Sequence, residues 1–168
     1  LHTPLLPLPY GNTAEVSGRQ YGTLQVESLK MSAAFLPGVI GSVSSYGDIM
    51  KDPVAVIRAI CQANFDVPKL RNEVYCQVIK LTTNFPEPGS PLNLNHWYLL
   101  GALCSSFLPS RKFVRFLRFH LRRTIDQCDI NGDEVVGAAT FCLEALKKTK
   151  VRDFPPSTEE IKGIISGR

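Results

Sequence analysis

The sequence lacks a long apolar run, a secretory signal and a glycosylation acceptor. Its most hydrophobic stretch, WYLLGALCSSFL, is shorter than the roughly 20 apolar residues that a membrane-spanning helix needs. No N-terminal signal pattern precedes it, and no Asn-x-Ser/Thr triplet occurs in the 168 residues. We therefore expect a cytoplasmic protein that neither spans a membrane nor is secreted.

The motifs of common enzymes and metal sites are also missing. There is no Gly-rich phosphate loop, no Gly-x-Ser-x-Gly turn, no pair of carboxylates in an apolar setting and no zinc-ligand spacing. CDINGD resembles part of a calcium loop, but alignment on Gly132 puts Gln127 and Ala138 where carboxylates are required. We expect no catalytic activity, no cofactor and no metal.

The composition is that of an ordinary globular domain, with 44% apolar and 20% charged residues. The five cysteines are odd in number and scattered, so we expect free thiols in a reducing compartment rather than a disulfide framework. The chain starts with Leu and not with Met, and we expect it to be a monomeric piece of a longer protein.

Helical patterns follow one another with almost no strand-like alternation, which predicts an all-α fold. We expect an extended, Pro-rich lead-in over 1–22, packed on the domain, and a single compact bundle of about seven helices over 23–168. The apolar helix at 92–107 is the candidate for the buried centre. The predicted helix starts are at Thr23, Pro53 after Asp52, Pro68, about Leu92, Ser110, about Asp133 and Ser157, where Glu160 completes a capping box.

Residues 110–123, SRKFVRFLRFHLRR, combine six Lys and Arg residues with three Phe. On a helical wheel the two kinds separate, and one broad side is apolar. The apolar side holds Phe113, Phe116, Leu117, His120, Leu121 and Thr124, with Val114 and Ile125 at its margin. Opposite, within roughly 60°, lies a set that we call the arginine strip, namely Arg111, Arg115, Arg118 and Arg122. Lys112 and Arg123 flank this strip, and Phe119 lies beside it.

A charged helix face is most often only a solvated face, but two details favour a binding surface here. No Asp or Glu stands three or four residues from these arginines until Asp126, so their repulsion is not offset locally. Moreover, Arg suits the recognition of carboxylates and phosphates. The partner would carry dense negative charge, as nucleic acid, anionic membranes and acidic protein surfaces do.

Residues 70–93, LRNEVYCQVIKLTTNFPEPGSPLN, resemble the signature of the myosin tail homology 4 domain. Asn72 stands in place of the family's usual Asp, and Leu81 in place of a frequent Gln. NHWYLLGALCSSFLPSRKFVRFLRFHLRR continues the resemblance. LLPLPYG near the start and LEALKKTKVRDFPPSTEEI near the end make the chain most similar to the tail of class X myosin.

The resemblance implies a helical module that precedes a FERM domain and helps to bind cargo tails in a cytoskeletal motor protein of filopodia, with 154–165 leading into the FERM domain. In the class X tail a lysine stripe on the corresponding helix contributes to microtubule binding. That role would pass to Arg115, Arg118 and Arg122, which keep the charge and would meet the acidic tails of tubulin.

The signature residues are interpreted as structural rather than partner-facing. They are Leu70, Arg71, Glu73, Tyr75 and Gln77, and Trp97 is grouped with them. We expect Arg71 to pair across helices, Tyr75 and Gln77 to bond to loops, and Trp97 to pack in the core or against a neighbouring domain. His120 is expected to be a half-buried packing residue rather than a ligand, and His96 likewise.

Two alternatives stay open beside microtubule docking. The bundle could act only as a brace for a FERM domain, or for a Rho GTPase-activating domain in an adaptor without a motor. The basic face could also contact an anionic membrane with Phe119 as a shallow anchor, but a single exposed ring is thin support. We do not expect nucleic acid to bind, because only Phe119 flanks the strip and no recognition-helix turn precedes it.

Overall fold

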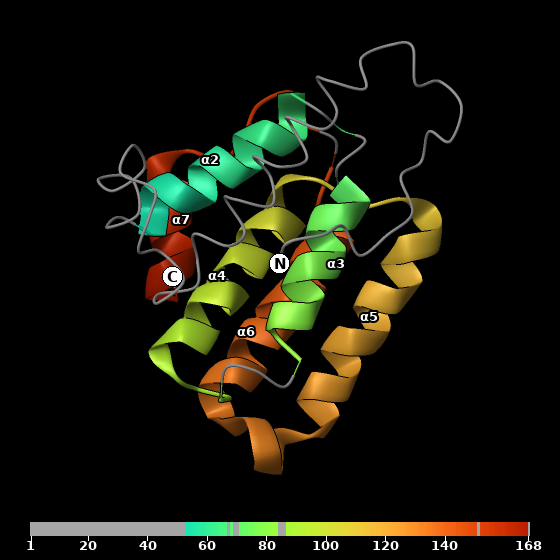
Figure 1. The fold of residues 1–168 in the computed structure, drawn as a ribbon, viewed down its shortest axis with the longest axis vertical. Helices are drawn as coiled ribbons and strands as arrows, with labels where there is room; N and C mark the ends of the chain where they lie inside the picture. The colour runs from blue at the N-terminus through green and yellow to red at the C-terminus, as the bar shows by residue number, and fades with distance from the viewer. Residues whose placement is uncertain (1–52, 67, 69–70, 84–86, 151, 168) are drawn as a thin grey trace, which may run out of the picture.

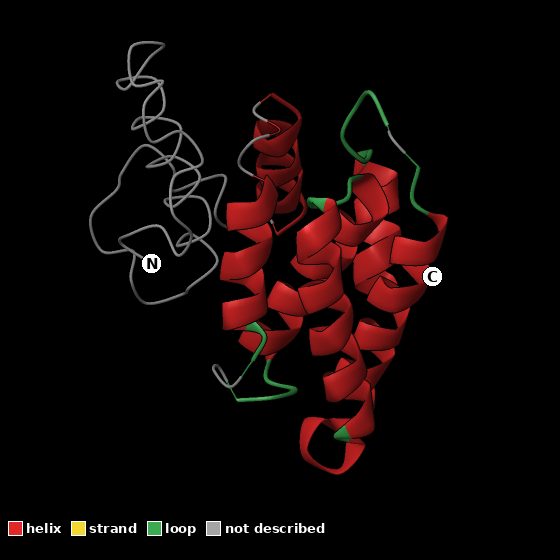
Figure 2. Cartoon of the chain, turned by 90° about the vertical axis from the view of Figure 1, so that its right-hand side faces the viewer, coloured by secondary structure: helices red, strands yellow, loops and turns green. Residues whose placement is uncertain are grey.

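The structure is a computed structural model that describes residues 53–66, 68, 71–83, 87–150 and 152–167. This part of the chain is all-helical and contains no strand, so the predicted helical bundle is confirmed (Figures 1 and 2). Its six helices are α2 (Pro53–Asp66), α3 (Arg71–Leu81), α4 (Pro91–Ser106), α5 (Arg111–Asp126), α6 (Cys128–Lys148) and α7 (Thr158–Ser166). The predicted lead-in over 1–22, the helix from Thr23 and the cap at Asp52 lie outside the described residues.

Helix α4 is the centre of the bundle, as its apolar sequence predicted, and packs against α2, α3, α6 and α7. Ser90 caps its first turn by accepting a hydrogen bond from the Asn93 N–H, and Pro91 occupies the first turn, where its missing N–H costs nothing. Its largest fully buried side chains are mostly apolar: His96, Trp97, Leu99, Leu100 and Leu103.

Helices α5 and α6 form an antiparallel pair joined at Gln127 (Figure 1). The sequence predicted a turn at CDINGD and a helix from Asp133. In the structure one helical turn begins earlier, at Cys128, and Gly132 then interrupts the helix with φ 76° and ψ 162°. Glycine suits this position because a side chain there would be strained. The regular part of α6 follows Gly132, so α5 and α6 lie side by side.

The C-terminal helix α7 packs against α2 and α4. The predicted capping box is confirmed: the Glu160 N–H donates to Ser157 Oγ (3.2 Å), and the Ser157 N–H donates to the Glu160 carboxylate (2.7 Å). Gly101 allows α6 and α7 to approach α4 closely, because a Cβ at this position would lie 3.2 Å from Ile164 Cγ2 and from the Phe141 ring. Among the described helices none is long and apolar enough to cross a membrane.

Candidate functional site

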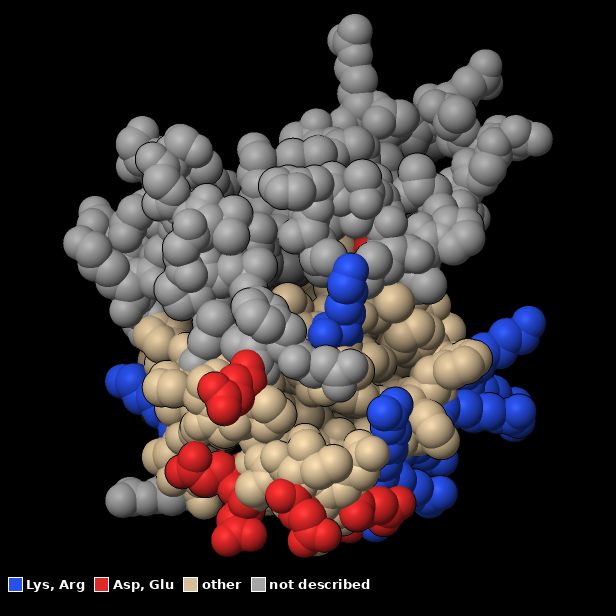
Figure 3. All heavy atoms as spheres, turned by 60° about the horizontal axis from the view of Figure 1, so that its bottom comes forward, with Lys and Arg blue, Asp and Glu red and all other residues tan. Residues whose placement is uncertain are grey.

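The outer face of α5 carries the predicted cations. All six are exposed: Arg111, Lys112, Arg115, Arg118, Arg122 and Arg123. In Figure 3 the Lys and Arg side chains gather along one side of the visible face, and the Asp and Glu side chains gather along its lower edge. Cations therefore dominate one side of this face.

The positive charge on α5 is not compensated by ion pairs within the described part of the chain. The two ion pairs found there join Lys147 to Glu144 (2.5 Å) and Arg152 to Glu160 (2.9 Å), and both lie away from α5. The helix has no acidic residue in its first turn, and its first acid is Asp126, at its last residue. From Arg111 to Arg118, an anion approaching this face meets cations that have no ion-pair partner among the described residues.

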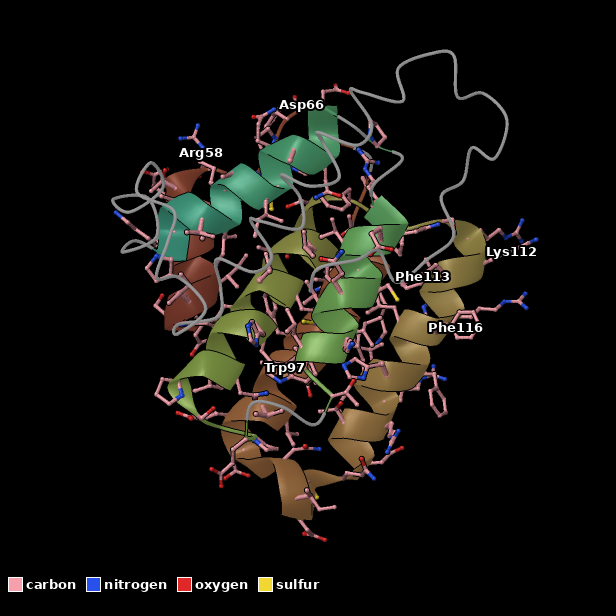
Figure 4. All side chains as sticks on the ribbon, in the orientation of Figure 1. Arg58, Asp66, Trp97, Lys112, Phe113 and Phe116 are labelled. Atoms are coloured by element: carbon pink, nitrogen blue, oxygen red, sulfur yellow. The ribbon has the colours of Figure 1, made fainter. Side chains whose placement is uncertain are left out.

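The apolar side of α5 is narrower than the sequence predicted. Its buried residues are Leu117, Leu121 and Thr124, which face α3 and α6. Phe116 was expected on this side, but its side chain is 68% exposed, about as much as Phe119 at 67%. The physical reason is that α3 and α6 cover only one flank of α5, and Phe116 lies beyond the edge of that contact. Figure 4 shows Lys112 and Phe116 extending outward from the helix.

His120 is a packing residue, as the sequence predicted. Its ring stacks on Trp97 with centroids 5.5 Å apart and planes 4° from parallel, and Nε2 lies 2.9 Å from Thr82 Oγ1. Burial lowers the pKa of His120 to about 4, because the charged form loses hydration, and the nearby Arg123 adds to the shift. The residue is therefore neutral at physiological pH and joins α3, α4 and α5. Trp97, only 1% exposed, belongs to the core.

Arg71 links helices, as expected, but its partners are a backbone carbonyl and two aromatic rings rather than a carboxylate. Its Nε donates to the Asn64 carbonyl at the end of α2 (3.1 Å). Its guanidinium lies over the rings of Phe107 (4.8 Å to the centroid) and Phe65 (5.5 Å). A planar cation can satisfy a carbonyl and stack on rings at the same time. Arg71 thus holds the start of α3 against the ends of α2 and α4.

The other signature residues of α3 face the interior. The Tyr75 hydroxyl donates to the Phe107 carbonyl at the end of α4 (2.7 Å). Gln77 was expected to bond to a loop, but its Nε2 donates to Glu73 Oε1 (2.7 Å) four residues earlier in the same helix. This expectation was wrong because side chains four apart on a helix lie next to each other. Glu73, Tyr75 and Gln77 are buried, and Leu70 lies outside the described residues.

Asn72 holds the start of α5. Its Nδ2 donates to Ser110 Oγ (3.0 Å), and its Oδ1 accepts from the Ser110 N–H (2.8 Å). Ser110 was expected to cap α5 with its own side chain, but it makes no such bond. Asn72, which stands in place of the family's usual Asp, therefore orients α5, the helix that carries the cations. Sequence reasoning missed this contact, since it joins residues 38 apart.

No group of three or more His, Cys, Asp or Glu side chains suited to a metal ion occurs in the described part of the chain. The chemistry that the described surface offers is therefore charge and exposed aromatic rings on α5.

A family model described as "MyTH4 domain" matches residues 57–163. Among curated proteins, Pleckstrin homology domain-containing family H member 3 of Homo sapiens is 30% identical over 170 residues, which cover 98% of this chain and 20% of that protein. Myosin-I heavy chain of Dictyostelium discoideum is 31% identical over 123 residues, covering 70% and 5% respectively.

The solved structure of the Myosin VII MyTH4-FERM MF1 domain of Dictyostelium discoideum superposes with a TM-score of 0.71 at 26% identity, covering 90% of this chain and 30% of that one. The chain spans a fifth or less of the length of the two curated relatives. A MyTH4 domain is a non-catalytic tail module. The match of the family model over 57–163 shows that this chain belongs to the MyTH4 domain family.

Proposed function

We propose that this MyTH4 domain docks onto acidic cytoskeletal surfaces, chiefly the acidic tails of tubulin on microtubules, through the arginine strip of α5. The observation that supports this most directly is the alignment of Arg111, Arg115, Arg118 and Arg122, all exposed and all without an ion-pair partner among the described residues. Guanidinium groups in a row can each engage a carboxylate of a flexible acidic segment.

The mechanism is electrostatic docking. A row of like charges attracts an acidic polymer at long range and speeds its encounter with the helix. Each exposed pair that forms contributes little, about 0–1 kcal/mol, so one module binds weakly. Salt screens such contacts, and binding should fall steeply as ionic strength rises.

The surroundings of the domain are part of the proposal. The similar Dictyostelium structure is a MyTH4-FERM unit, and we propose a FERM domain adjacent to this chain, with cargo tails held by the pair. The assignment of the parent to class X myosin, the filopodial, cytoplasmic location and the monomeric state stay predictions. The second candidate is a structural brace, which the inward-facing signature residues of α3 favour.

The test is co-sedimentation with microtubules of this chain and of a variant carrying Arg115→Glu, Arg118→Glu and Arg122→Glu. The control carries Lys148→Glu, Lys150→Glu and Lys162→Glu, which make the same change of net charge at exposed positions outside α5. We expect the first variant to lose binding and the control to keep most of it. Circular dichroism checks that both are folded.

Two further measurements separate docking from bracing. Binding should decrease between low and near-physiological salt, and it should decrease on microtubules from which subtilisin has removed the acidic tails. Binding by the folded arginine-strip variant at the level of the unchanged chain would refute the proposal. An absence of binding even at low salt would also refute it and leave the brace as the function.

A further inference from the structure

Helix α5 carries a second exposed row beside the arginine strip. It consists of Lys112, Phe116, Phe119 and Arg123, which follow one another at spacings of four, three and four residues, and we call it the aromatic edge. The arginine strip has the same spacings and starts one residue earlier, at Arg111. Residues so spaced form a line along one side of a helix, roughly 16 Å long for eleven residues of rise.

The two rings of this row are the feature that the arginine strip does not explain. Phe116 and Phe119 are 68% and 67% exposed, so most of each ring faces water. The Phe116 ring packs against Phe113, with ring centroids 6.2 Å apart, and no other aromatic ring of the described residues is stacked on it. Scattered exposed apolar residues are common, whereas apolar rings aligned with cations on a projecting helix mark an interaction surface.

The shape of this surface limits what it can bind. Among the described helices, α5 packs mainly against α3 and α6. Both rings lie on its exposed side, and Figure 4 shows Phe116 extending outward from the helix. A purely acidic polypeptide would satisfy the arginines but would give the rings no apolar surface to pack on. An anionic bilayer offers both, since its headgroups carry negative charge and its acyl region accepts rings a few ångströms deeper.

We propose that the aromatic edge docks α5 on an anionic membrane surface. Phe116 and Phe119 enter the interface between the headgroups, while Lys112 and Arg123 at the two ends of the row contact the phosphates and carboxylates. The arginine strip, which runs parallel on the same outer face, adds to the attraction. This activity goes beyond microtubule docking and depends on two residues that microtubule docking does not need.

Charge complementarity sets the orientation. The exposed acids Asp126, Asp129, Asp133 and Glu134 lie at the end of α5 and the start of α6, where an anionic surface would repel them. The helix therefore lies flat on the bilayer from Lys112 to Arg123, with the α5–α6 junction beyond Asp126 tilted away. Ile130, although 71% exposed, is next to Asp129 at this junction and takes no part.

The experiment is vesicle co-sedimentation of this chain with phosphatidylcholine vesicles and with vesicles that also contain phosphatidylserine. The variant carries Phe116→Ser and Phe119→Ser. The matched control carries Ile130→Ser and Phe154→Ser, which remove two equally exposed apolar side chains from other elements (71% and 64% exposed). All four side chains are mostly exposed, so we expect both variants to fold.

The unchanged chain should bind the vesicles that contain phosphatidylserine and not those of phosphatidylcholine alone. The aromatic-edge variant should lose affinity by roughly tenfold or more, because burying a ring contributes most of the apolar binding energy. The control should bind as the unchanged chain does. Microtubule co-sedimentation of the aromatic-edge variant should stay unchanged, which separates this proposal from the proposed function.

Three results would overturn the proposal: no binding to anionic vesicles, equal binding to neutral ones, or full affinity after loss of both rings. A second measurement does not depend on that variant. Phe119→Trp places an exposed indole on the aromatic edge. The only other tryptophan of the chain is Trp97, which is buried and whose environment the vesicles do not reach. The fluorescence of the exposed indole should shift to shorter wavelength when anionic vesicles are added, and an unshifted spectrum would contradict insertion.

Discussion

His120 lies where α3, α4 and α5 meet, and its neutral form is the one that the fold accommodates. Its ring stacks on Trp97 and lies in hydrogen-bond contact with Thr82, while Arg123 is the nearby cation that disfavours a second positive charge. Protonation would put a charge on a largely buried ring. The stability of the domain should therefore respond to acid through this one side chain.

We predict that the domain loses stability as pH falls from about 6.5 to about 4. In this window the unfolded chain binds a proton at His120 and the folded chain does not, so the free energy of unfolding decreases toward low pH. The loss reaches at most about 3 kcal/mol, following the size of the pKa shift. Urea unfolding at several pH values would measure it, with His120→Gln as the comparison.

The comparison isolates His120, because His96 and all carboxyl groups are common to both proteins. The difference in the free energy of unfolding between the two should change across this window and be constant above it. A parallel pH dependence of both proteins would show that His120 does not titrate in the way that its burial indicates.

At the level of elements, α5 shows what a helical wheel can and cannot predict. The wheel identified Leu117, Leu121 and Thr124 as inward-facing and the arginine strip as outward-facing, and the structure agrees. It placed Phe116 with the buried residues, and that was wrong. A wheel gives the angle of each residue about the axis, but the width of the covered arc depends on how many neighbouring helices pack there.

The helix ends show the same division between local and distant information. The capping box of α7 and the proline start of α4 were visible in the sequence, because each involves residues within one turn. The attachment of Asn72 to Ser110 and the contacts of Arg71 with Phe107 were not, because they join segments 38 and 36 residues apart. Local patterns predict elements, whereas tertiary contacts decide which side chains hold them together.

Two glycines inside helices allow a test of the packing between α4, α6 and α7. Gly101→Ala would place a Cβ 3.2 Å from Ile164 and from Phe141, whereas Gly137→Ala would place one in open space. We predict that Gly137→Ala stabilises the domain by about 0.5–1 kcal/mol, since alanine is the better helix former. Relative to Gly137→Ala, Gly101→Ala should lower the free energy of unfolding by at least about 1 kcal/mol, because Ile164 and Phe141 must move to make room for the Cβ.

Thermal or urea unfolding of both variants measures the difference directly. The gain in helix propensity is common to the two, so what remains is the cost of displacing Ile164 and Phe141. Equal effects of the two substitutions would mean that α7 does not approach α4 as closely as the structure indicates.

At the scale of the whole molecule, the burial of the five cysteines shows how well the interior of the bundle is shielded from solvent. Cys61, Cys104 and Cys142 are buried, Cys76 is partly buried and Cys128 is exposed. Burial raises the pKa of Cys61 to about 12, and it raises that of Cys142 as well, so these thiols are held in the unreactive neutral form.

We predict that a thiol reagent such as Ellman's reagent modifies one cysteine rapidly in the native protein. This thiol is Cys128, and Cys128→Ser should remove the rapid phase. The three buried thiols should react only after denaturation in guanidinium, when all five become accessible. Rapid modification of more than two thiols under native conditions would show that the core around α4 opens readily.

The overall bundle was more predictable than its surface. An apolar α4 surrounded by amphipathic neighbours follows from composition and periodicity, since such a helix must be covered on all sides. The candidate site was predicted in its charge but not in its shape. The second ring of the aromatic edge became visible only when α3 and α6 were seen to leave that flank of α5 open.

The narrow attachment of α5 also bears on how such domains diverge. Only three of its sixteen residues are buried, so most of its positions can be exchanged without disturbing the interior. Helix α4 has no such freedom, because it contacts neighbours on several sides. During evolution, substitutions on the outer face of α5 can therefore change its binding partners at little cost to folding, whereas the residues at the centre of the bundle are constrained.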